Sequence, residues 1–107
     1  MAFGLSTLHA SDIIGTWVYE VSDTPPEYAQ GEITISMEGE VYKAEIKSAG
    51  GIINLDKLKV DGNSISFNVM VDGSDVKVMM TFDGDNMTGR AESYDGVFTM
   101  KGKRKEN

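Results

Sequence analysis

The chain has 107 residues, of which 40% are hydrophobic and 25% are charged, and it contains no cysteine. A chain of this length forms one domain, and without cysteine it has no disulfide, zinc–thiolate site or thiol nucleophile. The formal net charge of -7 argues against nucleic acid or an anionic membrane as a partner, because both require a basic surface.

The first twelve residues differ in composition from the rest of the chain. The segment from Ala2 to Ala10 is small and apolar and carries no Lys or Arg. Two interpretations stay open: residues 1–12 are an N-terminal arm that plugs one end of the domain, or they are the remainder of a signal peptide. The second makes the protein exported, whether periplasmic, outer-membrane-associated or secreted. No apolar run approaches the ~20 residues that a membrane-spanning helix needs, so we expect one domain over residues 13–107.

Turn residues divide this domain into short segments of alternating hydrophobicity. Pairs such as Glu38-Gly39, Gly73-Ser74 and Asp95-Gly96 each separate two such segments, which is typical of antiparallel hairpins. No segment after Ser11 has helical periodicity. The pattern predicts eight strands, over residues 15–22, 30–37, 40–47, 51–60, 63–72, 75–83, 86–94 and 97–105.

The expected hairpins agree on one apolar face. A two-residue loop fixes which side chains lie opposite each other, and a slip of one residue would invert the whole face. The last hairpin is also expected to pair Gly89 with Gly102, where the wall coils sharply or another side chain crosses closely. The expected apolar pairs are Ile35 with Tyr42, Val71 with Val76, Val69 with Val78, Phe82 with Met87, and Ser93 with Phe98.

Residues 51–60 are the irregular segment, since their first two apolar side chains are out of phase with the last two. We interpret this as a β-bulge near Asp56-Lys57 that bends the wall. Consecutive hairpins with one apolar face bury it most simply by closing, which also removes both edge strands. The only long loop, 22–30, joins the first two strands. The sequence therefore predicts an eight-stranded antiparallel up-and-down β-barrel.

Gly15-Thr16-Trp17 at the start of such a meander resembles the Gly-x-Trp motif of the calycin superfamily, which includes lipocalins, fatty-acid-binding proteins and avidins. The resemblance implies that a basic side chain of the last strand, here Arg104, packs over the indole and closes that end of the barrel. The alternation independently places Arg104 on the inner face. More narrowly, the chain resembles the small, often exported lipocalin-like proteins of gut Bacteroidetes, although it lacks the Arg-x-Tyr carboxylate clamp of fatty-acid-binding proteins.

The opposite end of the barrel is the expected binding site. Loop 22–30 is stiffened by two prolines and carries an aromatic residue, which suits a lid over a barrel mouth. The inner wall suits an apolar or amphipathic small molecule, with Tyr19 or Tyr42 as a hydroxyl anchor. The residues expected to contact it are Tyr19, Val21, Pro26, Tyr28, Ile33, Tyr42, Ile46, Val71, Val76, Tyr94 and Phe98.

Other functions have less support from the residues. The only histidine, His9, has no expected base or nucleophile beside it, and the Asp-Gly turns suit tight hairpins rather than calcium loops. We therefore expect no enzyme activity, metal or cofactor. Small barrels also fill with their own side chains, so an alternative is a protein-binding module, such as a secreted inhibitor or accessory domain, with a filled barrel. Either would be a monomer or a weak dimer.

Overall fold

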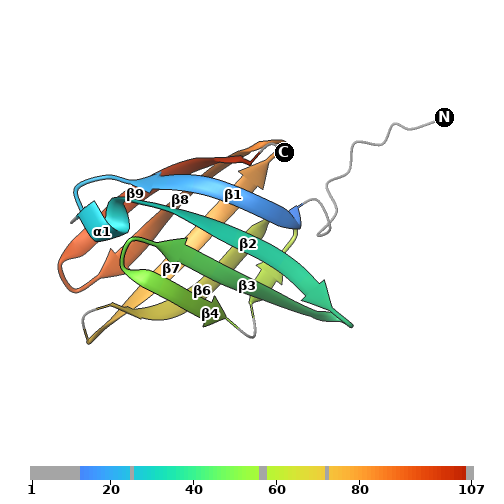
Figure 1. Cartoon of the computed structure of the whole chain (residues 1–107), viewed down its shortest axis with the longest axis horizontal. Coiled ribbons are helices and arrows are strands. Elements are labelled where there is room, and N and C mark those ends of the chain that lie inside the picture. Colours follow the sequence, from blue (N-terminus) through green and yellow to red (C-terminus); the bar gives the residue numbers. More distant parts are fainter. Residues whose placement is uncertain (1–12, 25, 56–57, 72, 106–107) are drawn as a thin grey trace.

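The structure, a computed structural model, describes residues 13–24, 26–55, 58–71 and 73–105. These residues form one antiparallel sheet of nine strands in the order β4-β3-β2-β1-β9-β8-β7-β6-β5, with a four-residue helix in the loop after β1 (Figure 1). The elements are β1 (Gly15–Val21), α1 (Pro26–Ala29), β2 (Gln30–Glu38), β3 (Val41–Ser48), β4 (Gly51–Leu55), β5 (Lys59–Asp61), β6 (Ser64–Val71), β7 (Ser74–Asp83), β8 (Asn86–Ser93) and β9 (Gly96–Arg104).

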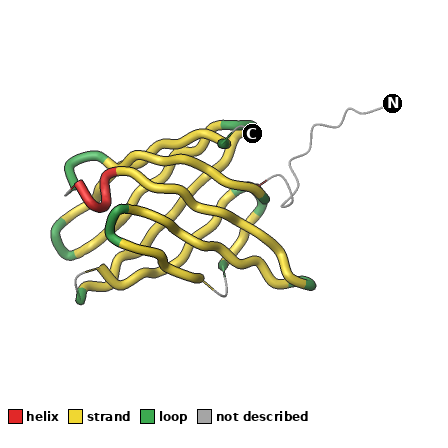
Figure 2. The backbone as a smooth tube through the Cα atoms, viewed as in Figure 1, coloured by secondary structure: helices red, strands yellow, loops and turns green. Residues whose placement is uncertain are grey.

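The sheet is a curled meander in which the first and last long strands meet. Each strand pairs with its sequence neighbour, except that β1 pairs with both β2 and β9. Figure 2 shows the strands of the front wall crossing those of the back wall, with short turns at both ends. The all-β antiparallel prediction is confirmed.

The predicted continuous barrel of eight strands is wrong in one place. Residues 51–60 are not one strand, because β4 ends at Leu55 and β5 begins at Lys59, at the two opposite edges of the sheet. The sheet is therefore not closed, and the expected bulge at Asp56-Lys57 lies outside the described residues. The phase change has a physical meaning, because the apolar side chains of both strands pack against the same core. The four-residue helix α1 was not predicted, because it is too short to show a helical period.

Three predicted hairpin registers are wrong by two residues. Val71 pairs with Ser74 rather than Val76, Ile35 with Ala44 rather than Tyr42, and Ala91 rather than Ser93 with Phe98. In the first two hairpins glycine supplies a positive φ at either central position of the turn, so the sequence does not decide which two residues form the loop. In the third, Ser93 pairs with Gly96, so the glycine follows the two-residue loop instead of lying in it. A shift of two keeps every side chain on its predicted face. The pair of Phe82 with Met87 is confirmed.

Gly89 and Gly102 do not pair with each other, but each marks a close approach of the neighbouring strand. Gly89 pairs with Met100, and Gly102 pairs with Met87. A Cβ atom on Gly102 would lie 2.5 Å from the carbonyl oxygen of Val18, and one on Gly89 would collide with that of Met79. The expectation that the wall is tight at these glycines therefore holds, although the predicted pairing does not.

The end of the barrel that carries the β2–β3, β5–β6 and β7–β8 turns is filled, and we call it the closed end. Trp17 is 0% exposed, its Nε1 donates a hydrogen bond to the Ile13 carbonyl at 3.0 Å, and its ring lies 4.5 Å from that of Phe82. The largest fully buried side chains are Trp17, Ile13, Ile33, Ile35, Ile65 and Met87. Each lies near one of these turns or near the start of β1.

Gly15, Trp17 and Arg104 form one unit at the closed end. The Arg104 guanidinium lies 4.4 Å from the centroid of the Trp17 ring, and its Nη1 donates to the Ile14 carbonyl at 2.8 Å. Gly15 has φ +138°, and a Cβ atom there would lie 2.7 Å from Arg104 Nη1. The glycine thus supplies both an unusual backbone angle and the space for the guanidinium. The stacking that the resemblance implied is present in the structure.

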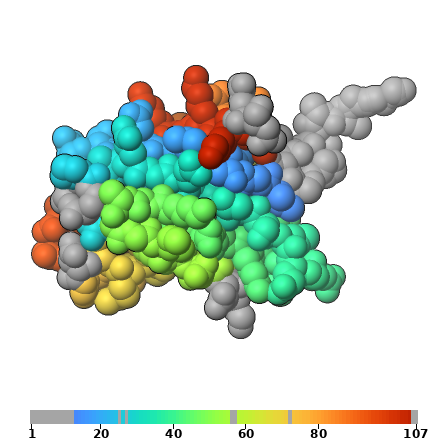
Figure 3. Space-filling model, in the orientation of Figure 1, coloured from blue at the N-terminus to red at the C-terminus, as the bar shows by residue number. Residues whose placement is uncertain are grey.

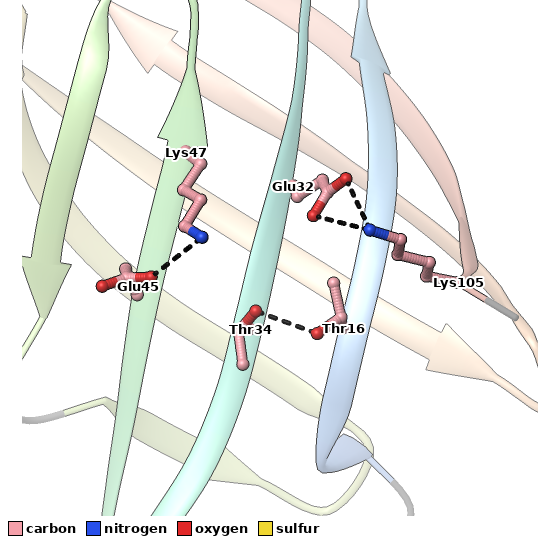
Figure 4. Close-up of polar contacts among 6 residues, drawn as sticks. All are labelled: Thr16, Glu32, Thr34, Glu45, Lys47 and Lys105. Carbon is pink, nitrogen blue, oxygen red and sulfur yellow. Dashed lines mark hydrogen bonds and ion pairs between the residues drawn. The ribbon is translucent and has the colours of Figure 1, made fainter. Parts of the chain in front are cut away.

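Polar pairs hold the outer side of the same wall. Thr16 and Thr34 hydroxyls are 2.9 Å apart between β1 and β2, and Lys105 Nζ lies 3.2 Å from a Glu32 carboxylate oxygen (Figure 4). Cross-strand pairs of this kind favour one register over its neighbours. These polar pairs lie on the outer face of the wall, opposite the side chains that form the core.

Candidate functional site

A cavity of about 460 Å³ occupies the end of the barrel opposite Trp17, which we call the open end. This end carries the loop with α1 and the β3–β4, β6–β7 and β8–β9 turns, and it lies at the left in Figure 1. The wall from β1 to β4 is continuous in the space-filling view (Figure 3). The cavity is therefore reached between the turns rather than through that wall.

The deep part of the cavity is apolar. Its floor and sides come from inward-facing residues of seven strands, β1, β3, β4, β6, β7, β8 and β9. The apolar lining includes Val21, Ile46, Ile53, Phe67, Val69, Val71, Val76, Val78, Met80, Ala91, Phe98 and Met100. Such a surface favours a hydrocarbon or aromatic occupant, because apolar area is removed from water on binding.

Tyr19 is the polar group set deepest in this wall. Its side chain is 8% exposed and lies across Gly31, where a Cβ atom would be 2.6 Å from the phenol oxygen. The hydroxyl makes no hydrogen bond with another described residue. Since no fully buried side-chain N or O atom in the described ranges lacks a partner, the hydroxyl must reach open space. Burial raises the pKa of Tyr19, so the phenol is neutral at pH 7 and available as both donor and acceptor.

The mouth of the cavity combines exposed apolar side chains with hydroxyls and one carboxylate. Ile52, Met70 and Tyr94 line it and are well exposed, Tyr94 by 82%. Thr24 and Tyr28 contribute from the loop that contains α1. Three turns and this loop thus surround a partly apolar rim.

Eight of the eleven residues expected to contact a ligand do line the cavity. They are Tyr19, Val21, Tyr28, Ile46, Val71, Val76, Tyr94 and Phe98. Their grouping follows from the alternation and from the loop assignment, both of which the sequence provided. Whether they contact a ligand stays a prediction.

The other three expected residues are not among the described residues that line the cavity, and each has a physical reason. Ile33 pairs with Trp17 and is fully buried at the closed end. Tyr42 pairs with Met37 near the β2–β3 turn, because the true register moves it toward that end. Pro26 is the first residue of α1 and is exposed on the loop.

The expected contact residues also left out lining residues such as Phe67, Val78 and Met80. Alternation places all three on the inner face, so the signal for them was present. The missing information was the position along each strand where the filled part of the interior ends.

Comparison of the sequence with known protein families and with curated proteins finds no match. Solved structures do resemble the fold. One is a redesigned β-barrel, with a TM-score of 0.66 and 16% sequence identity, covering 96% of this chain and 100% of that one. Another is a mutant of the fluorescent protein UnaG, with a TM-score of 0.61 and 11% identity, covering 91% of this chain and 99% of that one. At these identities the likeness shows a barrel-type fold.

The described residues offer neither a metal-binding cluster nor a membrane-spanning helix. Within the described ranges, no three His, Cys, Asp or Glu side chains gather into a group that could hold a metal ion. No helix in the described part of the chain is long and apolar enough to cross a membrane. The cavity is therefore the feature from which we argue a function.

Proposed function

We propose that this protein binds a small apolar or amphipathic molecule in the cavity at the open end, without covalent chemistry. The observation that supports this most directly is the cavity of about 460 Å³ with an apolar wall. Binding sites for small molecules are typically concave, mostly apolar, and ~300–1,000 Å³ in volume, with a few placed polar groups. The barrel supplies each of these properties at one end only.

The contacts suggest how such a molecule would lie. The apolar body occupies the space between Phe67, Val76 and Phe98, where it displaces water from hydrocarbon surface. A hydroxyl, carbonyl or amine on that body can hydrogen-bond with Tyr19, which otherwise lacks a partner among the described residues. A polar group at the other end of the molecule stays at the mouth, near Thr24, Ser93 and Tyr94.

Export and a lipocalin-like bacterial origin are part of this proposal. They are supported by the apolar segment before Ser11 and by the resemblance of Gly15-Thr16-Trp17 and Arg104 to the calycin pattern. Fractionation of a bacterium that expresses the full chain tests export, and recovery only from the cytoplasm would contradict it. The alternative function, a protein-binding module with a filled barrel, requires an interior that holds no small molecule.

The test of binding uses N-phenyl-1-naphthylamine, a neutral dye whose fluorescence rises in apolar surroundings. We expect saturable enhancement with the wild type. Ala91→Phe adds a ring to a residue that lines the cavity and should weaken the signal by about tenfold or more, since it fills the space. Thr88→Phe places the same ring on the exposed side of the same strand and should bind as the wild type does.

Circular dichroism and thermal unfolding establish that both variants fold. No saturable enhancement with wild-type protein, or equal enhancement with folded Ala91→Phe, would refute binding in this cavity. Native mass spectrometry of protein purified from its host then asks whether a small molecule or a second protein chain accompanies it. A second chain without a small molecule would favour the alternative.

A further inference from the structure

The charge that lines the cavity is negative. The described residues that line it include Asp95 and no Lys, Arg or His. The exposed Lys47 neighbours the lining residues Ile46 and Ser48 in the chain, but it does not line the cavity and its Nζ lies 3.9 Å from a Glu45 carboxylate oxygen. Asp95 lies in the exposed β8–β9 turn, and its carboxylate makes no ion pair with another described residue. Two further exposed carboxylates, Asp23 and Asp75, directly neighbour the lining residues Thr24 and Ser74 in the chain.

In the sequence, the residues outside the described ranges include one Lys and no Arg, whereas they include Asp12, Asp56, Asp72 and Glu106. The whole chain carries a formal net charge of -7. The long-range potential therefore has the same sign as the mouth.

Two basic side chains lie in a different place. Lys59 and Lys77 line a separate polar groove with Asn54, Leu55, Ser66, Phe67 and Asn68, beside the two edges of the sheet. Phe67 lines both the groove and the cavity, so its ring lies between the two spaces. Neither lysine is among the described residues that line the cavity.

From this distribution of charge we infer that the cavity selects amphiphiles with a neutral or cationic polar end and disfavours carboxylates. The inference rests on the proposed function. A carboxylate that entered the apolar part would lose its hydrating water, and no cationic side chain among the described lining residues would compensate for that loss. A carboxylate left at the mouth would face Asp95. An ammonium at the mouth would instead gain a favourable partner there, and a hydroxyl group would be indifferent to its charge.

The experiment displaces N-phenyl-1-naphthylamine from the full chain with three compounds that share one alkyl chain: decanol, decylamine and decanoate. At pH 7.5 and below their micelle concentrations, we expect decanol and decylamine to displace the dye. Decanoate should require at least a ~10-fold higher concentration than decanol. Comparable displacement by decanoate and decanol would overturn the inference.

Variants at the exposed turn test the role of Asp95. Asp95→Asn keeps a residue that tight turns accept, and it should weaken decylamine by up to about fivefold, as for an exposed ion pair, while leaving decanol unchanged. Asp95→Lys should strengthen decanoate and weaken decylamine. Equal affinities of all three compounds for wild type and both variants would refute the role of Asp95.

Two further outcomes distinguish a failure of the inferred charge selectivity from a failure of the proposed binding function. Failure of decanol and of the dye itself to bind would refute the proposed function. If decanoate binds to the wild type and Lys77→Gln abolishes that binding, the polar end reaches the side groove, and the inferred charge selectivity is wrong while the cavity remains a binding site.

Discussion

The closed and open ends of this barrel are built from the same strands but filled differently. Along β8 the inward residues after Met87 are all small, namely Gly89, Ala91 and Ser93, and along β1 the inward residues decrease in size from Trp17 through Tyr19 to Val21. On these two strands Trp17 and Met87 are fully buried in the core, whereas Val21, Ala91 and Ser93 line the cavity. Alternation decides which face a side chain takes, whereas its volume decides whether that level of the barrel is packed or hollow.

This comparison predicts that stability depends mainly on the closed end. Met87 is 1% exposed there, and Met87→Ala should lower the free energy of unfolding by about 2–5 kcal/mol, since it leaves a void among packed side chains. Met70→Ala makes the same change at the open rim, where the side chain is 64% exposed, and should cost at most ~0.5 kcal/mol. Urea denaturation measures both, and equal losses would contradict the division.

The next effect concerns the tight wall between β1 and β9. Gly102→Ala brings a Cβ atom against a backbone carbonyl and the Met87 side chain, so we expect a loss of about 1–3 kcal/mol in unfolding free energy. Lys101→Ala, on the exposed side of the same strand, is the matched control. A Gly102→Ala protein as stable as the control in thermal unfolding would show that the strands separate easily at this place.

Arg104 provides a smaller and more specific comparison. Arg104→Met keeps much of the side-chain length but removes the contact with the Trp17 ring, the bond to the Ile14 carbonyl and a surface ion pair with the exposed Asp85, and should cost about 1–2 kcal/mol. Arg90→Met removes an arginine whose partner Glu92 is on the surface, and should cost ~0.5 kcal/mol or less. Chemical denaturation with Trp17 fluorescence separates the two, and equal costs would mean that the stacked arrangement adds no stability.

The smallest effect is a pH dependence at the open end. Burial raises the pKa of Tyr19 above the ordinary value of 10.0, so the folded state holds this proton more tightly than the unfolded state. The resulting stability is fully present below the unfolded pKa and is lost as pH rises through the folded one. Tyr19→Phe should therefore lose less stability than the wild type above pH ~10. Tyr94→Phe controls for the loss of one phenol, and parallel profiles of wild type and Tyr19→Phe would contradict the prediction.

Most of the fold could be predicted from the sequence. For the site, the sequence predicted which side chains face inward but not where the filled part of the interior ends. Alternation assigns the faces correctly even where the register is wrong, because the error at Val71 and Ser74 is an even number of residues. The Trp17–Arg104 unit was accessible from the motif and the parity of the last strand. The break after Leu55 was visible only as a change of phase, which a bulge explains equally well, and α1 is too short to show a period.

The boundary between packed and hollow levels was not accessible in the same way. It depends on how side chains from several strands meet across the interior, and Ile33 shows the difficulty. Its type and its face are those of a cavity residue, but it lies opposite Trp17, where the ring takes the space. Tyr42 was misplaced for a related reason, since a two-residue error of register moves a side chain by a full level of the barrel.

β4 and β5 are the two edge strands of the sheet, and the gap between them is a seam in the wall of the barrel. Everywhere else, widening the circumference would break a ladder of backbone hydrogen bonds, at about 1 kcal/mol for each. Between β4 and β5 the described residues form no such ladder, and the backbone bond in this region, from Leu58 N–H to the Tyr42 carbonyl, is 3.3 Å long, so the circumference can grow there at a lower cost. A larger ligand would thus widen the barrel between β4 and β5 before any pair of strands separates.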